Sequence, residues 1–177
     1  TKMGAAVTVI ERDRPAAHAS GRSFAWINAS YPKKPYSYHH LSRLSLLAYH
    51  KLETEIGIDV HWGGSLEWFA SQENQKMLAQ EIQVQQSYGV PIEMISGEQA
   101  HELEPNVEFD KNSSIAFSKL DGAVDAVGIV ENFLRKTSSL GNEVLYPVTY
   151  KSLKVIGNKI VAVRTSVGEI ETDQVVF

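Results

Sequence analysis

A carboxylate and an arginine at the end of an apolar run form the first feature that could do chemistry. The run AAVTVIE covers residues 5–11 and ends on Glu11, and Arg12 follows it. Ligands of open parallel sheets bind outside the carboxyl ends of the strands. A carboxylate placed there accepts hydrogen bonds from both hydroxyls of a ribose, each worth roughly 1.5–3 kcal/mol with a charged partner. The alternative, which the strand alone leaves equally open, is that Glu11 simply ends a strand at the surface.

A second candidate is the segment HASGRSFAWINAS, residues 18–30. Its small residues would let backbone N–H groups approach an anion, and Arg22 could bond phosphate oxygens in pairs. Phe24 and Trp26 offer flat apolar faces for a ring system. The alternative reading of this segment is a well-packed loop with a buried tryptophan.

The sequence gives little support for a metal site or for a catalytic nucleophile. With 0 Cys, the chain has no disulfides, thiolate nucleophiles or cysteine metal ligands. His39, His40 and His50 have no histidine or acid four residues further on, so no metal site is predicted. His61 beside Trp62 is interpreted as structural. Neither a Gly-x-Ser-x-Gly elbow nor a P-loop occurs, and no catalytic residue is predicted.

The composition is that of an ordinary globular protein about one domain long. The 177 residues carry a net charge of −4, with both signs mixed along the chain, which argues against a nucleic-acid surface. No apolar stretch approaches the roughly 18 residues that a bilayer crossing needs, and no signal peptide opens the chain. We therefore expect a cytoplasmic protein that binds neither nucleic acid nor membrane.

The elements that must position these residues begin with a strand and a loop. Residues 5–11 predict a buried strand, and residues 12–36 predict an irregular loop with one helical turn. An amphipathic helix is predicted from about 37 to 56, ended by Gly57. Its apolar stripe consists of Leu41, Leu44, Ala48, Leu52 and Ile56.

The middle of the chain mixes short strands and capped helices. Residues 61–70 predict strand around a Gly-Gly turn. Ser71 predicts the cap of a polar helix that runs to about Tyr88, and Ser96 with Gln99 predicts a capping box that opens a short helix to about 104. Two further strands are predicted at 91–95 and 113–118.

The last third is rich in strands. Residues 120–125 predict a turn before a helix that ends at Gly141. Residues 143–177 predict a β-meander with two-residue turns, closed by a buried parallel strand at DQVVF, residues 173–177. The order of elements indicates a mixed α/β (α+β) fold.

Both ends of the chain suggest excision from a longer protein. Gly4 suits the end of a helix of which Thr1 to Met3 would be the stump, and DQVVF stops within a strand. In a dinucleotide-binding unit, the ribose-binding acid follows the glycine fingerprint by about 20 residues. Glu11 has too few residues before it for that fingerprint to be present, so its absence is uninformative.

Taken in order, several motifs resemble one family. They are VTVIERD, SGRSFAWIN, GGSLEWFASQEN, MISGEQAHELEPN, DGAVDAVGIVENFLRKTSSLG, YPVTYKSLKVIGNKIVAV and DQVVF. This series resembles the FAD-dependent oxidoreductases of the D-amino-acid-oxidase-like family, which includes glycine and sarcosine oxidases. The likeness covers nearly the whole chain, but only the middle of such a protein: the N-terminal Gly-x-Gly-x-x-Gly and the C-terminal half have no counterpart here.

The resemblance implies a set of FAD-contacting residues. They are Glu11 and Arg12 at the adenosine ribose, Ser20, Gly21, Arg22 and Ser23 at the pyrophosphate and ribityl chain, Ala25 and Trp26 near the isoalloxazine, and Val148 at adenine. Some family members attach flavin through a histidine that would align near Ala25. Because this chain has none there, attachment by that route is not expected, while attachment through the remaining half stays open.

The resemblance also implies a domain division and a function. Residues 1–36 and 123–177 would form part of a Rossmann-like FAD-binding domain, and residues 37–122 part of a mixed-sheet substrate domain. The parent protein would oxidise an amino acid or secondary amine by hydride transfer to flavin N5, and the fragment alone would be inactive. The alternative is a non-catalytic α/β fragment or binding module without flavin activity. Substrate identity, oxidase or dehydrogenase activity, and oligomeric state stay open.

Overall fold

The computed structural model describes residues 4–30 and 33–177, which form two compact units. The first unit combines Thr1–Ser23 with Ala126–Phe177, and the second unit is Phe24–Asp125. The mixed α/β fold class is confirmed by the alternation of helices and strands along the chain. The predicted helix stump at the N-terminus lies outside the described residues.

The first unit contains a pair of parallel strands. Strand β1 (Thr8–Ile10) pairs in parallel with β8 (Glu143–Leu145), with Val9 opposite Val144. The strand predicted near the N-terminus and its parallel arrangement are therefore confirmed. Its predicted burial is wrong, because β1 has β8 as its one strand neighbour among the described residues and its side chains are exposed or half-buried.

Helix α4 (Ala126–Ser139) leads into β8. Parallel strands must be joined by a crossover connection, usually a helix, and α4 forms the last part of the connection from β1 to β8. The backbone leaves the helix through Gly141, whose φ of 79° is left-handed, as predicted. The next residue, Asn142, accepts a hydrogen bond at its Oδ1 from the Val7 N–H at 2.8 Å. This bond and the β1–β8 pairing both connect the N-terminal segment to the end of α4.

The predicted meander is confirmed in the C-terminal part of the first unit. Strands β9 (Tyr150–Ile156), β10 (Lys159–Thr165) and β11 (Gly168–Glu171) pair antiparallel in the order β11-β10-β9. The β9–β10 turn uses Gly157 and Asn158, both at positive φ, because the right-handed twist of the strands favours that turn type.

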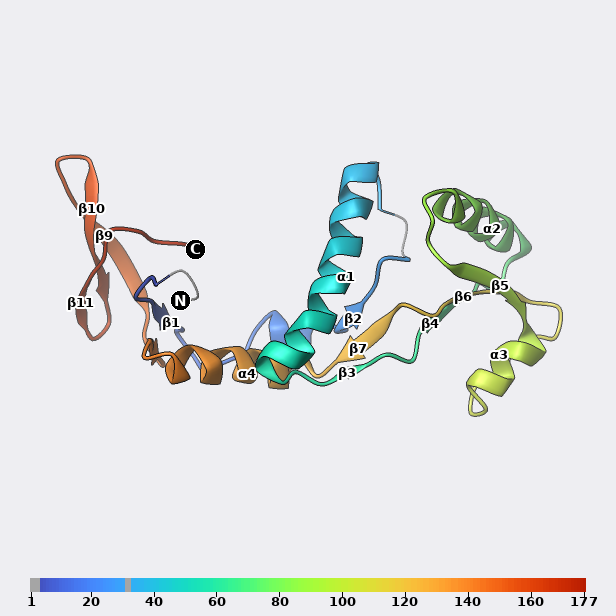
Figure 1. The fold of residues 1–177 in the computed structure, drawn as a ribbon, viewed down its shortest axis with the longest axis horizontal. Coiled ribbons are helices and arrows are strands. Elements are labelled where there is room, and N and C mark those ends of the chain that lie inside the picture. Colours follow the sequence, from blue (N-terminus) through green and yellow to red (C-terminus); the bar gives the residue numbers. More distant parts are fainter. Residues whose placement is uncertain (1–3, 31–32) are drawn as a thin grey trace. The chain divides into compact units, whose positions relative to one another are not determined.

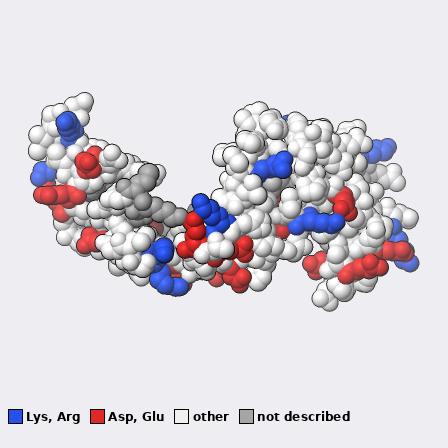
Figure 2. All heavy atoms as spheres, viewed as in Figure 1, with Lys and Arg blue, Asp and Glu red and all other residues white. Residues whose placement is uncertain are grey.

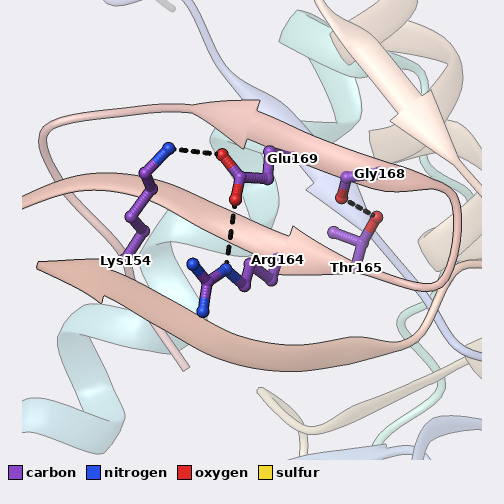
Figure 3. A network of polar contacts seen from close by, with 5 residues as sticks. All are labelled: Lys154, Arg164, Thr165, Gly168 and Glu169. Carbon is purple, nitrogen blue, oxygen red and sulfur yellow. Dashed lines mark hydrogen bonds and ion pairs between the residues drawn. The ribbon is translucent and has the colours of Figure 1, made fainter.

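Charged side chains reinforce the exposed face of this meander (Figure 3). Glu169 accepts hydrogen bonds from Lys154 Nζ at 2.7 Å and from Arg164 Nε at 3.1 Å. These bonds hold the pKa of Glu169 below its ordinary value. The predicted final strand at residues 173–177 is wrong: no strand forms there. The Phe177 ring instead packs edge-on against Tyr150 at 5.0 Å.

Two strands of the first sheet of the second unit, β2 (Trp26–Ile27) and β7 (Gly122–Val124), were not predicted because they are very short. The sheet has the order β2-β7-β3, with β7 antiparallel to both β2 and β3 (Val60–His61). Strand β2 lies in the predicted loop, and β7 lies in the predicted turn. Two or three residues are too few to show an alternating pattern, so only partners distant in the sequence define these strands.

The second sheet has the order β4-β6-β5, from β4 (Ser65–Glu67), β6 (Ser114–Ser118) and β5 (Ile92–Ser96). Helix α2 (Gln72–Ser87) packs on one face, and α3 (Gly97–Leu103) contacts β5 and β6 from the other side (Figure 1). The core under α2 consists of Leu78, Ile82, Val90, Ile92 and Ala116. The prediction of strand around Gly63-Gly64 within residues 61–70 is confirmed, because β3 ends and β4 begins on either side of this pair, although the two strands join different sheets.

The predicted caps of both helices are confirmed. The Ser71 Oγ accepts from the Asn74 N–H at 3.2 Å. The Ser96 Oγ accepts from the Gln99 N–H at 3.2 Å, and the Gln99 Oε1 accepts from the Ser96 N–H at 2.9 Å. Local side-chain bonds of this kind depend on residues only three apart, which is why the sequence reveals them.

Helix α1 (Tyr36–Ile56) ends at Gly57 as predicted, but the predicted stripe does not identify its buried face. Leu41 and Leu44 are 59% and 51% exposed, whereas His39, Ser42 and Leu46 are the buried residues of this helix. The His39 ring packs in a cluster with Tyr36 and Tyr88, at centroid distances of 6.1 and 5.3 Å. Tertiary packing, rather than the apolar pattern, selects this polar face.

The surface carries mixed charge. On the face drawn in Figure 2, Lys and Arg side chains lie among Asp and Glu. Within residues 4–30 and 33–177, none of the helices has the length and apolarity that crossing a bilayer demands.

Replacing His39 by Phe is expected to flatten the pH dependence of stability. Burial lowers the pKa of His39, helped by the nearby charges of Arg43, Lys33 and His40. In the unfolded chain, His39 is protonated as the pH falls through about 6.5, whereas in the folded chain it stays neutral to lower pH. Acidification therefore favours the unfolded chain, and wild-type stability is lost below that pH. Urea unfolding between about pH 8 and pH 5 measures this loss.

His61→Phe is the control, because His61 is exposed and does not contribute to the lowered pKa of His39. This control should retain the wild-type loss of stability on acidification. An equal loss in His39→Phe and wild type would contradict the prediction.

Candidate functional site

The structure brings together two residues that the resemblance assigns to the adenosine end of a cofactor. The Glu11 N–H donates to the Leu145 carbonyl at 3.0 Å, and the Val148 N–H donates to the Glu11 carbonyl at 2.7 Å. These bonds extend the β1–β8 ladder beyond its last paired residues. Glu11 and Val148 therefore meet at the carboxyl end of a parallel pair, although they are far apart in sequence.

The Glu11 side chain takes part in a tight turn after β1. Its Oε1 accepts from the Asp13 N–H at 2.8 Å, while Asp13 Oδ2 lies 2.5 Å from His18 Nε2 and 3.6 Å from Arg12 Nε. Ligand atoms of Glu11, Asp13 and His18 all lie within 4.8 Å of one another. The sequence analysis did not predict this trio. The contacts given above explain it as part of a hydrogen-bonded loop. A carboxylate with one bond at one oxygen still has acceptor sites at both oxygens.

The Ser20–Arg22 segment forms a single 3₁₀ turn, η1, which is the helical turn expected in this loop. A Cβ on Gly21 would lie 2.2 Å from the Ala16 carbonyl oxygen, so this glycine is required by close backbone approach. The Gly21 N–H donates to that same oxygen at 3.0 Å. Arg22 is exposed, and its guanidinium forms no ion pair among the described residues. Ser23 follows in extended conformation.

Ala25 and Trp26 belong to the second unit. Ala25 has a φ of 59°, a left-handed conformation that costs a non-glycine residue energy and is found preferentially at functional sites. Its carbonyl accepts from the Val124 N–H at 3.1 Å. Trp26 starts β2 opposite Ala123, and its ring meets Phe24 edge-on at 6.4 Å. The predicted loop is thus held in a defined backbone conformation.

A buried acid that the sequence analysis did not identify lies directly before β7. Asp121 is 0% exposed and accepts from the Ala29 N–H at 3.3 Å, from the Ser65 hydroxyl at 2.7 Å and from the Ser30 hydroxyl. An Asp-Gly pair suggests a turn, which is why residues 120–125 were predicted as one. No local signal shows that this acid is buried, because its donors come from distant segments.

Burial also shifts ionisation around this acid. Burial lowers the pKa of Lys33, and the negative charge of Asp121 partly opposes that effect. The Lys33 ammonium donates to both the Asn28 carbonyl and the Asn28 side-chain oxygen at 2.8 Å. The pKa of Glu67 is raised, mainly by burial and further by the charges of Glu81 and Asp121.

The predicted site residues do not line either of two cavities found within the described residues, one in each unit. A cavity of about 690 Å³ in the first unit is lined by residues of α4, of β8 and of the segment Arg14–Ala16. A cavity of about 300 Å³ in the second unit lies against β4 and α3, with Trp68 and Phe109 packed edge-on at 5.0 Å. The crevice expected beside Glu11 therefore coincides with neither cavity.

Comparison with known proteins gives consistent matches. A family model described as "FAD dependent oxidoreductase" (DAO) matches residues 1–177. A D-amino acid dehydrogenase of Azorhizobium caulinodans is 31% identical over 130 residues, which cover 71% of this chain and 31% of that protein. D-amino acid dehydrogenase 2 of Mesorhizobium japonicum is 29% identical over 128 residues, with the same two shares.

Solved structures show the same fold. An L-proline dehydrogenase from P. horikoshii superposes with a TM-score of 0.84 at 24% identity, covering 97% of this chain and 46% of that chain. A glycine oxidase from Bacillus cereus ATCC 14579 gives a TM-score of 0.87 at 18% identity, covering 98% of this chain and 48% of that one. The chain thus spans about a third of the curated relatives and about half of these structures.

Replacing Gly21 by Ala is expected to lower the stability of the first unit. The new methyl group would meet a backbone carbonyl, which cannot rotate away as a side chain can. Overpacking of this kind costs about 1–3 kcal/mol. The midpoint of urea unfolding measures the change.

Gly63→Ala is the control, since a Cβ at Gly63 meets nothing within 4 Å and the residue has no left-handed φ. Equal midpoints for the two variants would contradict the requirement for glycine at position 21.

Proposed function

The chain belongs to the DAO family of FAD dependent oxidoreductases, and from this membership we propose that the protein oxidises an amino acid or a secondary amine. The family is FAD dependent, so FAD is the cofactor. The names of the relatives, which include dehydrogenases and oxidases of amino acids, support a substrate with an oxidisable carbon–nitrogen bond.

The chemistry that FAD supplies when bound is acceptance of a hydride at N5 from the substrate α-carbon, which leaves an imine for hydrolysis. The protein's own task is to bind and orient. In this proposal, the carboxylate of Glu11 receives the ribose hydroxyls, with Arg12 alongside, and Val148 meets adenine through its backbone. Ser20, Gly21, Arg22 and Ser23 face the pyrophosphate and ribityl chain, while Ala25 and Trp26 face the isoalloxazine.

The observation that carries the proposal is the meeting of Glu11 and Val148 at the carboxyl end of the β1–β8 pair. The donor and acceptor types fit FAD, because Glu11 retains acceptor capacity for hydroxyls and the exposed Arg22 forms no ion pair within the described part of the chain. The Val148 N–H is already donated to Glu11, so the backbone group that we assign to adenine is the Val148 carbonyl.

We also propose a division of labour between the units. The first unit would provide most of the cofactor contacts, and the second unit would belong to the substrate domain. Because the chain spans 46% to 48% of the solved relatives, we infer that residues 1–177 alone do not sustain turnover.

Glu11→Gln is expected to weaken FAD binding by an intact protein that carries this chain. Gln retains an acceptor oxygen for the Asp13 N–H but loses the charge that strengthens bonds from ribose hydroxyls. A loss of roughly 1.5–3 kcal/mol corresponds to about 10- to 150-fold in the dissociation constant. Titration of the apoprotein with FAD, followed by flavin fluorescence, measures it.

Glu171→Gln, at an exposed position on β11, should leave the dissociation constant unchanged. A wild-type protein that purifies colourless and cannot be reconstituted with FAD would refute the proposed function. Equal affinity of the Glu11→Gln variant and wild type would remove Glu11 from the site.

The 177-residue chain by itself is expected to bind FAD weakly. It contains no Gly-x-Gly-x-x-Gly loop to hold the pyrophosphate at a helix N-terminus. Fluorescence titration of the isolated chain with FAD checks this expectation, and a dissociation constant in the micromolar range or tighter would contradict it.

A further inference from the structure

Asp121 is the fully buried acid of the second unit, and its carboxylate joins segments that are distant in sequence. The hydroxyls of Ser30 and Ser65 both donate to Oδ2, and the Ala29 N–H donates to Oδ1. The Asp121 carbonyl also accepts from the Gly64 N–H at 3.0 Å. The residue lies between β6 and β7, so it connects the two sheets of this unit.

One side of this cluster belongs to the segment after β2. Ala29 and Ser30 are 3% and 7% exposed, so their donors have no access to water if the carboxylate is removed. β2 itself pairs with β7, Ile27 lying opposite Gly122. The Asp121 carboxylate therefore continues the β2–β7 pairing beyond Gly122. Here a side-chain oxygen accepts the hydrogen bond that a backbone carbonyl accepts within a sheet.

Trp26 begins the same strand, and Ala25 directly precedes it. A left-handed alanine persists only where its surroundings determine the backbone on both sides. On one side, the Ala25 carbonyl is bonded to the Val124 N–H. On the other side, β2 continues directly into the segment that is hydrogen-bonded to Asp121. A displacement of Ala29 would therefore also displace Trp26 through β2.

We propose that Asp121 is a positioning residue that fixes β2 and thereby sets the orientation of Trp26 toward the flavin ring. This inference rests on the proposed function, which places Ala25 and Trp26 near the isoalloxazine. Asp121 acts through the Ala29–Ser30 segment, without touching the cofactor itself.

The two serines separate positioning from simple stability. Ser30 and Ser65 bond the same carboxylate oxygen, but Ser30 belongs to the β2 side and Ser65 begins β4. Removing either hydroxyl disturbs the buried cluster. Only the loss of the Ser30 hydroxyl disturbs the segment that leads to Trp26.

The experiment uses Asp121→Asn, Ser30→Ala and Ser65→Ala, with the exposed Asp59→Asn as control. In the intact flavoprotein, the position of the visible flavin absorption band is recorded for each variant. In the 177-residue chain, which has 3 Trp, the indole N–H resonance of Trp26 is recorded by NMR and assigned with Trp26→Phe.

We expect Asp121→Asn and Ser30→Ala to shift both the flavin band and the Trp26 resonance. Ser65→Ala should lower the unfolding midpoint and leave both signals in place, and Asp59→Asn should change neither signal. Equal effects of Ser30→Ala and Ser65→Ala on the two signals, or no shift in Asp121→Asn, would overturn the inference. An intact protein without flavin would refute the proposed function and the flavin-facing role together, whereas the Trp26 resonance still tests whether Asp121 fixes β2.

Discussion

Parallel pairing of β1 with β8 is the interaction on which the candidate cofactor site depends. The pairing aligns two segments separated by most of the chain, and the backbone of Glu11 extends it by a donated and an accepted hydrogen bond. Both bonds fix the main chain and leave the Glu11 carboxylate outside the ladder. Side-chain chemistry at this position is therefore separable from the fold, and a charge-neutral variant can test one without destroying the other.

Close backbone approach is the second constraint, and it recurs in both units. Gly21 lies against the Ala16 carbonyl, and a Cβ on Gly122 would lie 2.9 Å from the Trp62 ring. Trp62 in turn donates to Glu53 Oε2 at 2.9 Å, so its ring has little freedom to move away. Such positions require glycine because of space rather than left-handed dihedral angles. They determine how tightly η1 turns and how closely β7 approaches the residue that follows β3.

The second unit concentrates buried polar groups around Asp121. Burial penalises charge, so the pKa of Glu67 rises and that of Lys33 falls, whereas the donors around Asp121 supply the hydrogen bonds that a buried carboxylate requires. These bonds depend on direction as well as distance. A polar cluster therefore defines the relative placement of β2, β4 and β7 more narrowly than apolar contacts alone would.

The sequence by itself determined the features that rest on near neighbours in the chain. These were the caps at Ser71 and Ser96, the end of α1 at Gly57, the meander turns and the family motifs. Only the tertiary structure decided the short strands β2 and β7, the buried face of α1 and the environment of Asp121. The reason is physical: caps and turns are bonds across two to four residues, whereas short strands and buried acids are stabilised by partners tens of residues away. The residues that neighbour a short strand or a buried acid in the sequence do not indicate which distant segments will pack against it.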